Sequence, residues 1–201
     1  MVTVSDVGVT ACLAEKPLMK DRGSFLLTHF GLSGPVILNV SKSLNCVPDF
    51  KNTLLKIDFL PSIKEPELES KIQLLASTDG KKLLSIALGD LLPRRLLDGL
   101  FSQIGFSPDK KCAGISRDER KSIVASIKSK TINITGTLGY AKAEVTTGGV
   151  NLDEVNSKTM ESKLQKGLYF AGEILDIDGP IGGFNFQAAW STGFLAGSQS
   201  P

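Results

Sequence analysis

The residues best suited to chemistry lie near the end of the chain, where glycines come directly before a helix-compatible stretch. Gly182 and Gly183 precede an amphipathic run that begins at Phe184. The first backbone N–H groups of a helix have no intrahelical acceptor, and the helix dipole makes this end positive. This end therefore favours anions and electron-rich oxygen atoms. Because glycine has no Cβ, a planar or phosphorylated ligand can approach the backbone closely here.

Acidic side chains accompany these glycines. Glu173 directly follows the apolar run 168–171, and Asp176 and Asp178 follow in the loop. A carboxylate after a strand can accept hydrogen bonds from the hydroxyls of a sugar or a ribityl chain. Isolated glycine motifs also join strands to helices in folds that bind no ligand, with loop acids that are simply solvated. These residues alone leave both interpretations open.

The elements that must position this segment follow from periodicity. Short β-prone runs alternate with turn signals in the first sixty residues, and helical spacing with about four helices follows up to about residue 127. Ser116 is placed to cap the last of these helices. The pattern then reverts to strands before a final strand, loop and helix. The strands are predicted at 2–12, 24–30, 36–41, 53–60, 131–135, 141–146 and 168–171, and the final helix at 184–196.

The fold class predicted from this order is α+β. Strands before and after an inserted helical unit pair most simply with each other, so residues 1–60 and 129–145 form one β subdomain. The helical subdomain, 61–128, interrupts it, and together they form a domain over 1–145. The strand, loop and helix of 146–201 belong to an α/β domain that the remaining sequence does not complete.

Composition narrows the classes of partner. The 201 residues include 23 lysines and arginines against 21 acids, so no field of one sign favours nucleic acid or an anionic membrane. Bases between Arg94 and Lys121 alternate with acids, as on a solvated helix face. We therefore expect no nucleic-acid partner and no membrane partner. No run approaches the length of a membrane helix.

Histidine and cysteine usage excludes several chemistries. His29 is the single histidine, so the chain cannot form a histidine metal cluster or a Ser-His-Asp triad, and we predict no metal site. The cysteines Cys12, Cys46 and Cys112 form no CxxC pair. Reduced thiols and a cytoplasmic location are the simplest interpretation. Trp190, on the final helix, is expected in the core, with an aromatic wall against a ligand as the alternative.

Beyond spacing, the sequence resembles the aminoacetone oxidase-like, conserved NAD(P)/FAD-dependent flavoproteins. The C-terminal match includes TTGGV at 146–150, KTMESK at 158–163, GLYFAGE at 167–173 and the run 176–187. Upstream, LTHFGLSGP at 27–35 resembles the inserted domain of that family, and DLLPRRL at 90–96 resembles its helical part. The chain has no GxGxxG turn, so the resemblance implies the middle and C-terminal part of a truncated flavoprotein.

The resemblance also implies which residues meet flavin adenine dinucleotide (FAD). Glu173 would lie near the ribityl or pyrophosphate region, and the glycines and first helical residues would present backbone at the pyrimidine end of the flavin ring. The cofactor-binding residues that we predict are Thr147, Gly148, Gly149, Gly172, Glu173, Asp178, Gly182, Gly183, Phe184 and Asn185. Catalytic residues are not predicted.

Two hypotheses follow. In the first, the chain is a fragment of an FAD-dependent oxidoreductase that acts on a small-molecule substrate, with NAD(P)H as a candidate reductant, and the insert covers the substrate. In the second, the chain by itself is an inactive binding or structural module, because half of the FAD site is missing. Unpartnered hydrophobic surface on the last strand and helix is expected to cause self-association.

Overall fold

The computed structural model describes residues 1–44, 47, 49–107 and 109–199, and the chain divides into two compact units. The first unit covers 1–135 and the second covers 136–201. Cys46 and Pro108 lie outside the described residues, whereas Cys12 and Cys112 are buried, free thiols.

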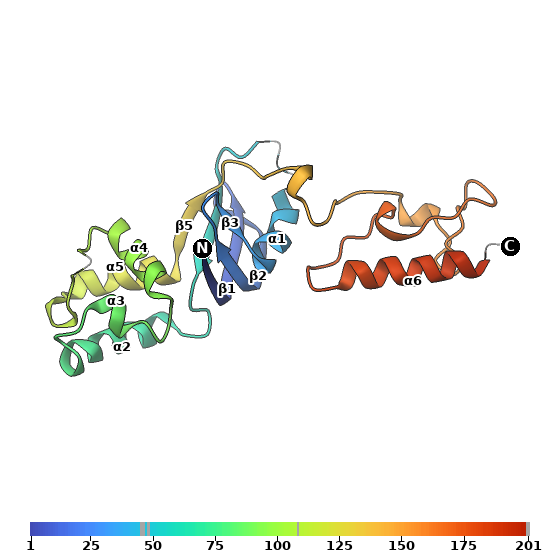
Figure 1. Ribbon diagram of the computed structural model, residues 1–201. Helices are drawn as coiled ribbons and strands as arrows, with labels where there is room; N and C mark the ends of the chain where they lie inside the picture. Colours follow the sequence, from blue (N-terminus) through green and yellow to red (C-terminus); the bar gives the residue numbers. More distant parts are fainter. Residues whose placement is uncertain (45–46, 48, 108, 200–201) are drawn as a thin grey trace. The chain divides into compact units, whose positions relative to one another are not determined.

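The first unit is built on a five-stranded, curled antiparallel sheet with the order β3-β2-β1-β4-β5 (Figure 1). β1 and β2 form a hairpin in which Val2 lies opposite Leu27, and the shift of register between Val4 and Val7 is a bulge that bends the sheet. The strands are β1 (Val2–Leu13), β2 (Lys16–Leu27), β3 (Leu32–Ser33), β4 (Thr53–Asp58) and β5 (Lys130–Asn133).

The predicted strand at 36–41 is wrong, because these residues form helix α1 (Pro35–Ser41). Pro35 is at the start of the helix, where its fixed φ suits the first turn. Val36 and Val40, four residues apart, both pack into the core under the sheet. Burial of this helical face outweighs the weak preference of β-branched residues for strands. A 3₁₀ turn, η1 (Lys42–Leu44), extends the helix.

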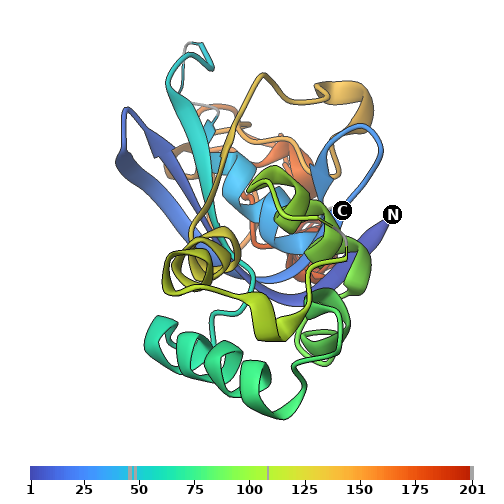
Figure 2. The same ribbon diagram turned by 90° about the vertical axis from the view of Figure 1, so that its left-hand side faces the viewer.

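The helical segment forms four α-helices, as predicted, and they cluster beyond one end of the sheet (Figures 1 and 2). The predicted cap is confirmed: Ser116 Oγ accepts from the Glu119 amide, and the Ser116 amide donates to Glu119 Oε2 at 2.7 Å. The helices are α2 (Glu65–Thr78), α3 (Leu84–Ala87), α4 (Arg94–Gln103) and α5 (Arg117–Lys128), with the 3₁₀ turn η2 (Cys112–Gly114) before α5.

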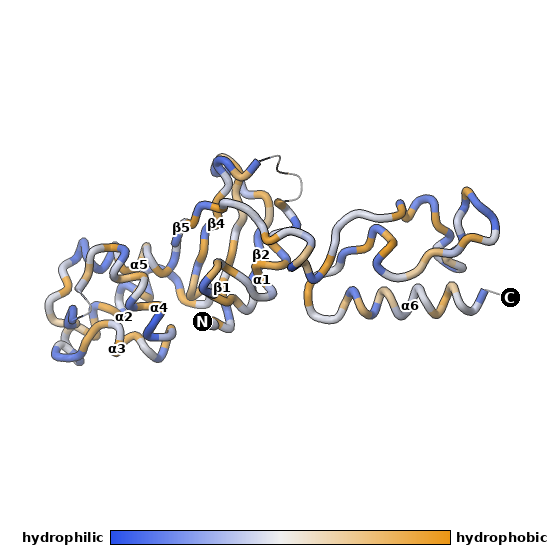
Figure 3. Tube along the Cα trace, turned by 45° about the horizontal axis from the view of Figure 1, so that its top comes forward, coloured by the Kyte–Doolittle hydropathy of each residue, from blue (hydrophilic) through white to orange (hydrophobic). Residues whose placement is uncertain are grey.

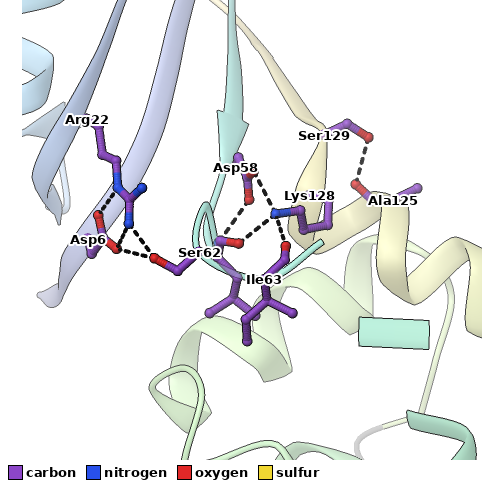
Figure 4. A network of polar contacts seen from close by, with 9 residues as sticks. Asp6, Arg22, Asp58, Ser62, Ile63, Ala125, Lys128 and Ser129 are labelled. Atoms are coloured by element: carbon purple, nitrogen blue, oxygen red, sulfur yellow. Dashed lines mark hydrogen bonds and ion pairs between the residues drawn. The ribbon is translucent and has the colours of Figure 1, made fainter. Parts of the chain in front are cut away.

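The Lys128 side chain links the two connections between the sheet and the helices (Figure 4). Lys128 Nζ donates to the carbonyl oxygens of Leu60 and Ile63, each at 2.6 Å, and lies 2.7 Å from Asp58 Oδ2. Leu60 and Ile63 lie on the connection from β4 to α2, and Lys128 is the last residue of α5, just before β5. The Lys128 side chain is only 6% exposed, so its three partners replace the water that the ammonium would otherwise bind.

The second unit has a small core of its own. Val155, Met160 and Leu175 are buried, and Phe170 and Leu195 pack beside them. Its helical elements are η3 (Tyr140–Lys142), η4 (Leu152–Glu154), η5 (Gly172–Ile174) and the long helix α6 (Phe184–Gln199). The predicted final helix is therefore confirmed and is one turn longer.

Two strands predicted in the second part of the chain are wrong. Residues 141–146 form the end of η3 and irregular backbone, because no described segment pairs with them. In 168–171 the only ladder pair is an antiparallel bridge between Tyr169 and Glu161. Met160, next to Glu161 on the partner segment, has a φ of +62°, which is uncommon for a residue other than glycine.

Helix α6 presents large apolar side chains that the described residues leave uncovered. Phe186, Trp190 and Phe194 follow one another at four-residue spacing, which places them on one side of the helix, and they are 73–76% exposed. Figure 3 shows the hydrophobic positions recurring along α6. The expectation that Trp190 is in the core is therefore wrong for this chain. Among the described residues, no helix is long and apolar enough to cross a bilayer.

Replacement of Lys128 by methionine should lower the free energy of unfolding by about 2–3 kcal/mol, because two partly buried carbonyls and Asp58 lose their partner. Urea denaturation measures this change. Lys56→Met is the matched control, since Lys56 is an exposed residue of β4. Equal destabilisation by the two substitutions would contradict the role assigned to Lys128.

The exposed side of α6 should cause self-association of the chain. The double variant Trp190→Gln/Phe194→Gln should therefore shift the weight-average mass measured by sedimentation equilibrium toward the monomer. Leu74→Gln, which changes a 60% exposed residue of α2, should leave the mass unchanged. A monomeric wild-type chain at all concentrations would disprove the prediction.

Candidate functional site

All ten predicted cofactor-binding residues lie in the second unit, in three segments: 147–149, 172–178 and 182–185. The first two segments lie side by side. Val150 pairs with Leu175 in a parallel bridge, with the Val150 amide 2.8 Å from the Ile174 oxygen and the Asp176 amide 3.1 Å from the Val150 oxygen. The structure thus brings Gly149 and Val150 against residues 174–176, directly after Gly172 and Glu173 in sequence.

Gly149 makes this close approach sterically feasible. A Cβ on Gly149 would lie 2.5 Å from the Ile174 oxygen and 2.7 Å from the Leu175 carbonyl carbon. Its φ of +154° and the +90° of Gly148 are values that L side chains rarely adopt. A Cβ on Gly148, by contrast, would meet nothing within 4 Å, so the space beside its backbone is open.

The second segment is fastened to α6 by a residue that sequence analysis did not single out. The Gly172 amide donates to Thr192 Oγ1 at 3.0 Å, and the same hydroxyl donates to the Ala188 oxygen at 2.7 Å. Thr192, 8% exposed, is the one buried residue of α6. Glu173, next to Gly172, remains exposed and can accept hydrogen bonds. The sequence signal that could have identified Thr192 is its place as a threonine on the inner side of a helix that is otherwise rich in alanine and glycine.

The third segment begins α6. Gly182 and Gly183 have φ values of +133° and +95°, and both are exposed. The Gln187 amide donates to the Gly183 oxygen at 3.0 Å, so the amides of 184–186 precede the first intrahelical hydrogen bond. A Cβ on Gly183 would meet nothing within 4 Å. The backbone at this helix start is therefore open to a ligand on the side where N–H donors are available.

The Asn185 side chain makes contacts that the sequence did not predict, and its predicted contact with the cofactor stays a prediction. Its side chain closes the preceding loop, because Asn185 Oδ1 accepts from the Gly179 amide at 2.7 Å and Asn185 Nδ2 donates to the Gly179 oxygen at 3.0 Å. This two-bond clamp fixes the glycines that lead into the helix. Asp178 precedes the clamp and is half-buried.

The spacing of these segments suits an extended ligand. Gly172 is held at Thr192, eight residues beyond Phe184, and a rise of 1.5 Å per residue separates these positions by about 12 Å along α6. A ligand that reaches both would have one end at the helix start and the other beside Glu173. The described residues contain no cluster of three histidine, cysteine or acidic side chains that could hold a metal ion.

Comparison with known proteins gives the family. A family model described as HI0933-like protein barrel and H2TH domain matches residues 2–145. The chain belongs to this HI0933-like family. The link to a flavoprotein family that the sequence indicated is confirmed at this level.

Three curated relatives align with most of the chain. The ribosomal RNA dihydrouridine synthase of Haemophilus influenzae is 38% identical over 84% of the chain, and that of Escherichia coli is 34% identical over 85%; the alignments cover 40% of each relative. The 3-dehydro-bile acid delta(4,6)-reductase of Clostridium scindens is 28% identical over 96% of the chain and 47% of its own length. The chain thus spans less than half the length of these relatives. None of the three names contains aminoacetone oxidase, and that finer assignment stays a prediction.

Thr192→Val should accelerate hydrogen exchange at the Gly172 amide roughly five-fold, because the amide loses an acceptor worth about 1 kcal/mol. NMR-detected amide exchange measures this rate. Thr192→Ser retains the hydroxyl and should exchange like the wild type. The attachment of 172–174 to α6 would be disproved if the valine variant exchanged no faster than the serine variant.

Proposed function

We propose that this chain is part of an FAD-dependent oxidoreductase in which residues 146–201 present backbone to the flavin and residues 1–145 form an insert that covers the substrate. The observation that carries the proposal is the start of α6. There, two exposed positive-φ glycines with open space beside Gly183 lie next to backbone amides that have no intrahelical acceptor.

The residues present fit one part of such a cofactor. The backbone N–H groups of Phe184 and Asn185 would donate to the oxygen and nitrogen atoms at the pyrimidine end of the flavin ring, where they favour negative charge. Gly148 and Gly149 would line the ring, and Glu173 would accept hydrogen bonds from ribityl hydroxyls. Asn185 acts as a positioning residue, because its clamp on Gly179 holds the glycines in place.

The names of the relatives share one reaction type. Formation of dihydrouridine and the action of a delta(4,6)-reductase both add hydrogen across a carbon–carbon double bond. When bound, FAD supplies two-electron hydride chemistry of this kind. We therefore propose reduction of a carbon–carbon double bond conjugated with a carbonyl, with NAD(P)H as reductant and the cytoplasm as location.

The alternative is a chain that binds no flavin and acts as a structural or binding module. The exposed apolar side of α6 favours this alternative, because a helix with Phe186, Trp190 and Phe194 uncovered lacks the packing that would fix one wall of a flavin site.

The purified chain should retain visible flavin absorption after incubation with FAD and desalting. Gly183→Val should weaken FAD binding, measured by quenching of flavin fluorescence, at least ten-fold, which corresponds to about 1.4 kcal/mol. The valine would occupy the open space beside the helix start and remove the close approach of the ring.

Gly105→Val is the matched control. Gly105 also has a positive φ, +80°, and open space around it, but it lies in the helical part of the first unit. Equal loss of FAD affinity in the two variants would contradict the proposed site. A colourless wild-type chain without fluorescence quenching would favour the structural module.

A further inference from the structure

The helical part of the first unit is covalently attached to one edge of the sheet. Its two connections leave from the end of β4 at Asp58 and return to the start of β5 at Lys130. In the sheet order β3-β2-β1-β4-β5 these two strands are neighbours at one edge. An attachment at one edge lets the helical part turn about that edge, unless contacts with β1 and β2 hold it.

The contacts of Lys128 lie at this edge. Lys128 Nζ binds the carbonyl oxygens of Leu60 and Ile63, so the segment 60–63 is held to the end of α5. The same ammonium group lies 2.7 Å from Asp58 Oδ2 at the end of β4. The segment 60–63 therefore moves together with the helices, and a change of direction between sheet and helices can take place only on the sheet side of Lys128.

A second set of contacts joins this segment to β1 and β2 (Figure 4). The Arg22 guanidinium of β2 donates to both carboxylate oxygens of Asp6 in β1, with Nε–Oδ1 and Nη2–Oδ2 distances of 2.6 Å. Arg22 Nη2 also donates to Ser62 Oγ, and the Ser62 hydroxyl lies 3.4 Å from Asp6 Oδ2. We call Asp6, Arg22 and Ser62 the latch, because they join the helical part to the strands that carry no connection to it.

The bulge in β1 places Asp6 in the latch. Val4 and Val7 are both buried, so the shift of register between them leaves two residues, Ser5 and Asp6, outside the alternating pattern. A bulge turns a side chain away from its regular direction, and here Asp6 meets Arg22 of the neighbouring strand. The hydrogen bond from Arg22 lowers the pKa of Asp6, so the pair stays ionised to a lower pH than a free carboxyl would.

The two sets of contacts differ in how readily they open. The Lys128 side chain is 6% exposed, whereas those of Arg22 and Asp6 are 52% and 45% exposed. Breaking a buried ion pair leaves an uncompensated charge and is costly, whereas an exposed pair is weak and is screened by salt. The latch therefore opens more readily than the contacts of Lys128.

A cavity of about 150 Å³ lies beside the latch. Its walls come from the sheet at Val4 and Asp6, from the segment 59–63, and from the helical part at Leu91. Well-packed protein interiors contain few spaces larger than a water molecule. At this place the sheet and the helical part face each other across a space, which gives the helical part room to move.

We propose that the ends of β4 and β5 form a hinge and that the latch holds the helical part closed against the sheet. When the latch opens, residues 60–128 turn about Asp58 and Ser129 while Lys128 keeps its contacts. The purpose of this motion rests on the proposed function, because an insert that covers a substrate must admit it and release the product. The latch then sets the fraction of molecules in which the insert is open.

NMR relaxation dispersion of backbone amides, measured on the full chain without FAD, tests the hinge. This method detects minor forms that exchange on the microsecond-to-millisecond timescale of hinge motions. Arg22→Gln should raise the exchange contribution at Val4 and Leu91 roughly two- to five-fold, because an exposed ion pair shifts an equilibrium by about this factor. The two residues should share one exchange rate, since a hinge moves both walls of the cavity together.

A second latch variant and a matched control separate the hinge from a general loss of stability. Ser62→Ala should give a similar rise, because it removes the contact with the helical part and leaves the pair of Asp6 and Arg22 intact. Arg94→Gln is the control. It breaks the exposed ion pair of Arg94 with Asp98, which lies within α4 and does not cross the hinge.

A rise in both latch variants, with one shared rate and no rise in the control, would support the proposal. Unchanged dispersion in either latch variant, an equal rise in the control, or exchange confined to 61–63 would overturn it. Because no FAD is present in these samples, a chain that fails to bind FAD would contradict the proposed function without changing this outcome.

Discussion

The arrangement of the first unit depends on the contacts of one buried ammonium group. Lys128 joins the end of α5 to the connection that leaves β4, so both crossings between sheet and helices meet at one side chain. The Phe59 amide adds a bond of 2.9 Å to the Ile127 oxygen at the same place. Two of the three partners of Lys128 are carbonyl oxygens, and a hydrogen bond to a carbonyl depends on direction as well as distance. The contact therefore fixes the orientation of the two connections as well as their separation. The helical part thereby keeps a defined position on the sheet.

The second unit depends on close backbone approach in place of a large core. Its buried cluster is small, yet Gly149 lies against 174–176 and Thr192 holds Gly172, so two loops have fixed places along α6. Asn185 fixes the third loop. Such an arrangement leaves backbone amides accessible to a ligand, whereas larger side chains would cover them. The small core of this unit also leaves the apolar side of α6 exposed.

Local signals predicted much of this structure. The helical spacing of 65–127, the Ser116 cap and the final helix were readable because each depends on residues close in sequence. The strand predicted at 36–41 failed because the packing of Val36 and Val40 depends on contacts that are distant in sequence. The strand predicted at 168–171 makes a single bridge, to Glu161. For the site, the glycines were predicted from their conformational freedom, whereas Thr192 and the Asn185 clamp were not.

We propose that residues 147–149, 172–173 and 182–185 form one flavin-contacting surface. Hydrogen exchange of the chain with and without FAD, followed by mass spectrometry, tests it most directly. The account predicts slower exchange in peptides covering these three segments, greatest at the start of α6, and unchanged exchange in 1–135. Protection confined to 1–135, or no protection at saturating FAD, would contradict it.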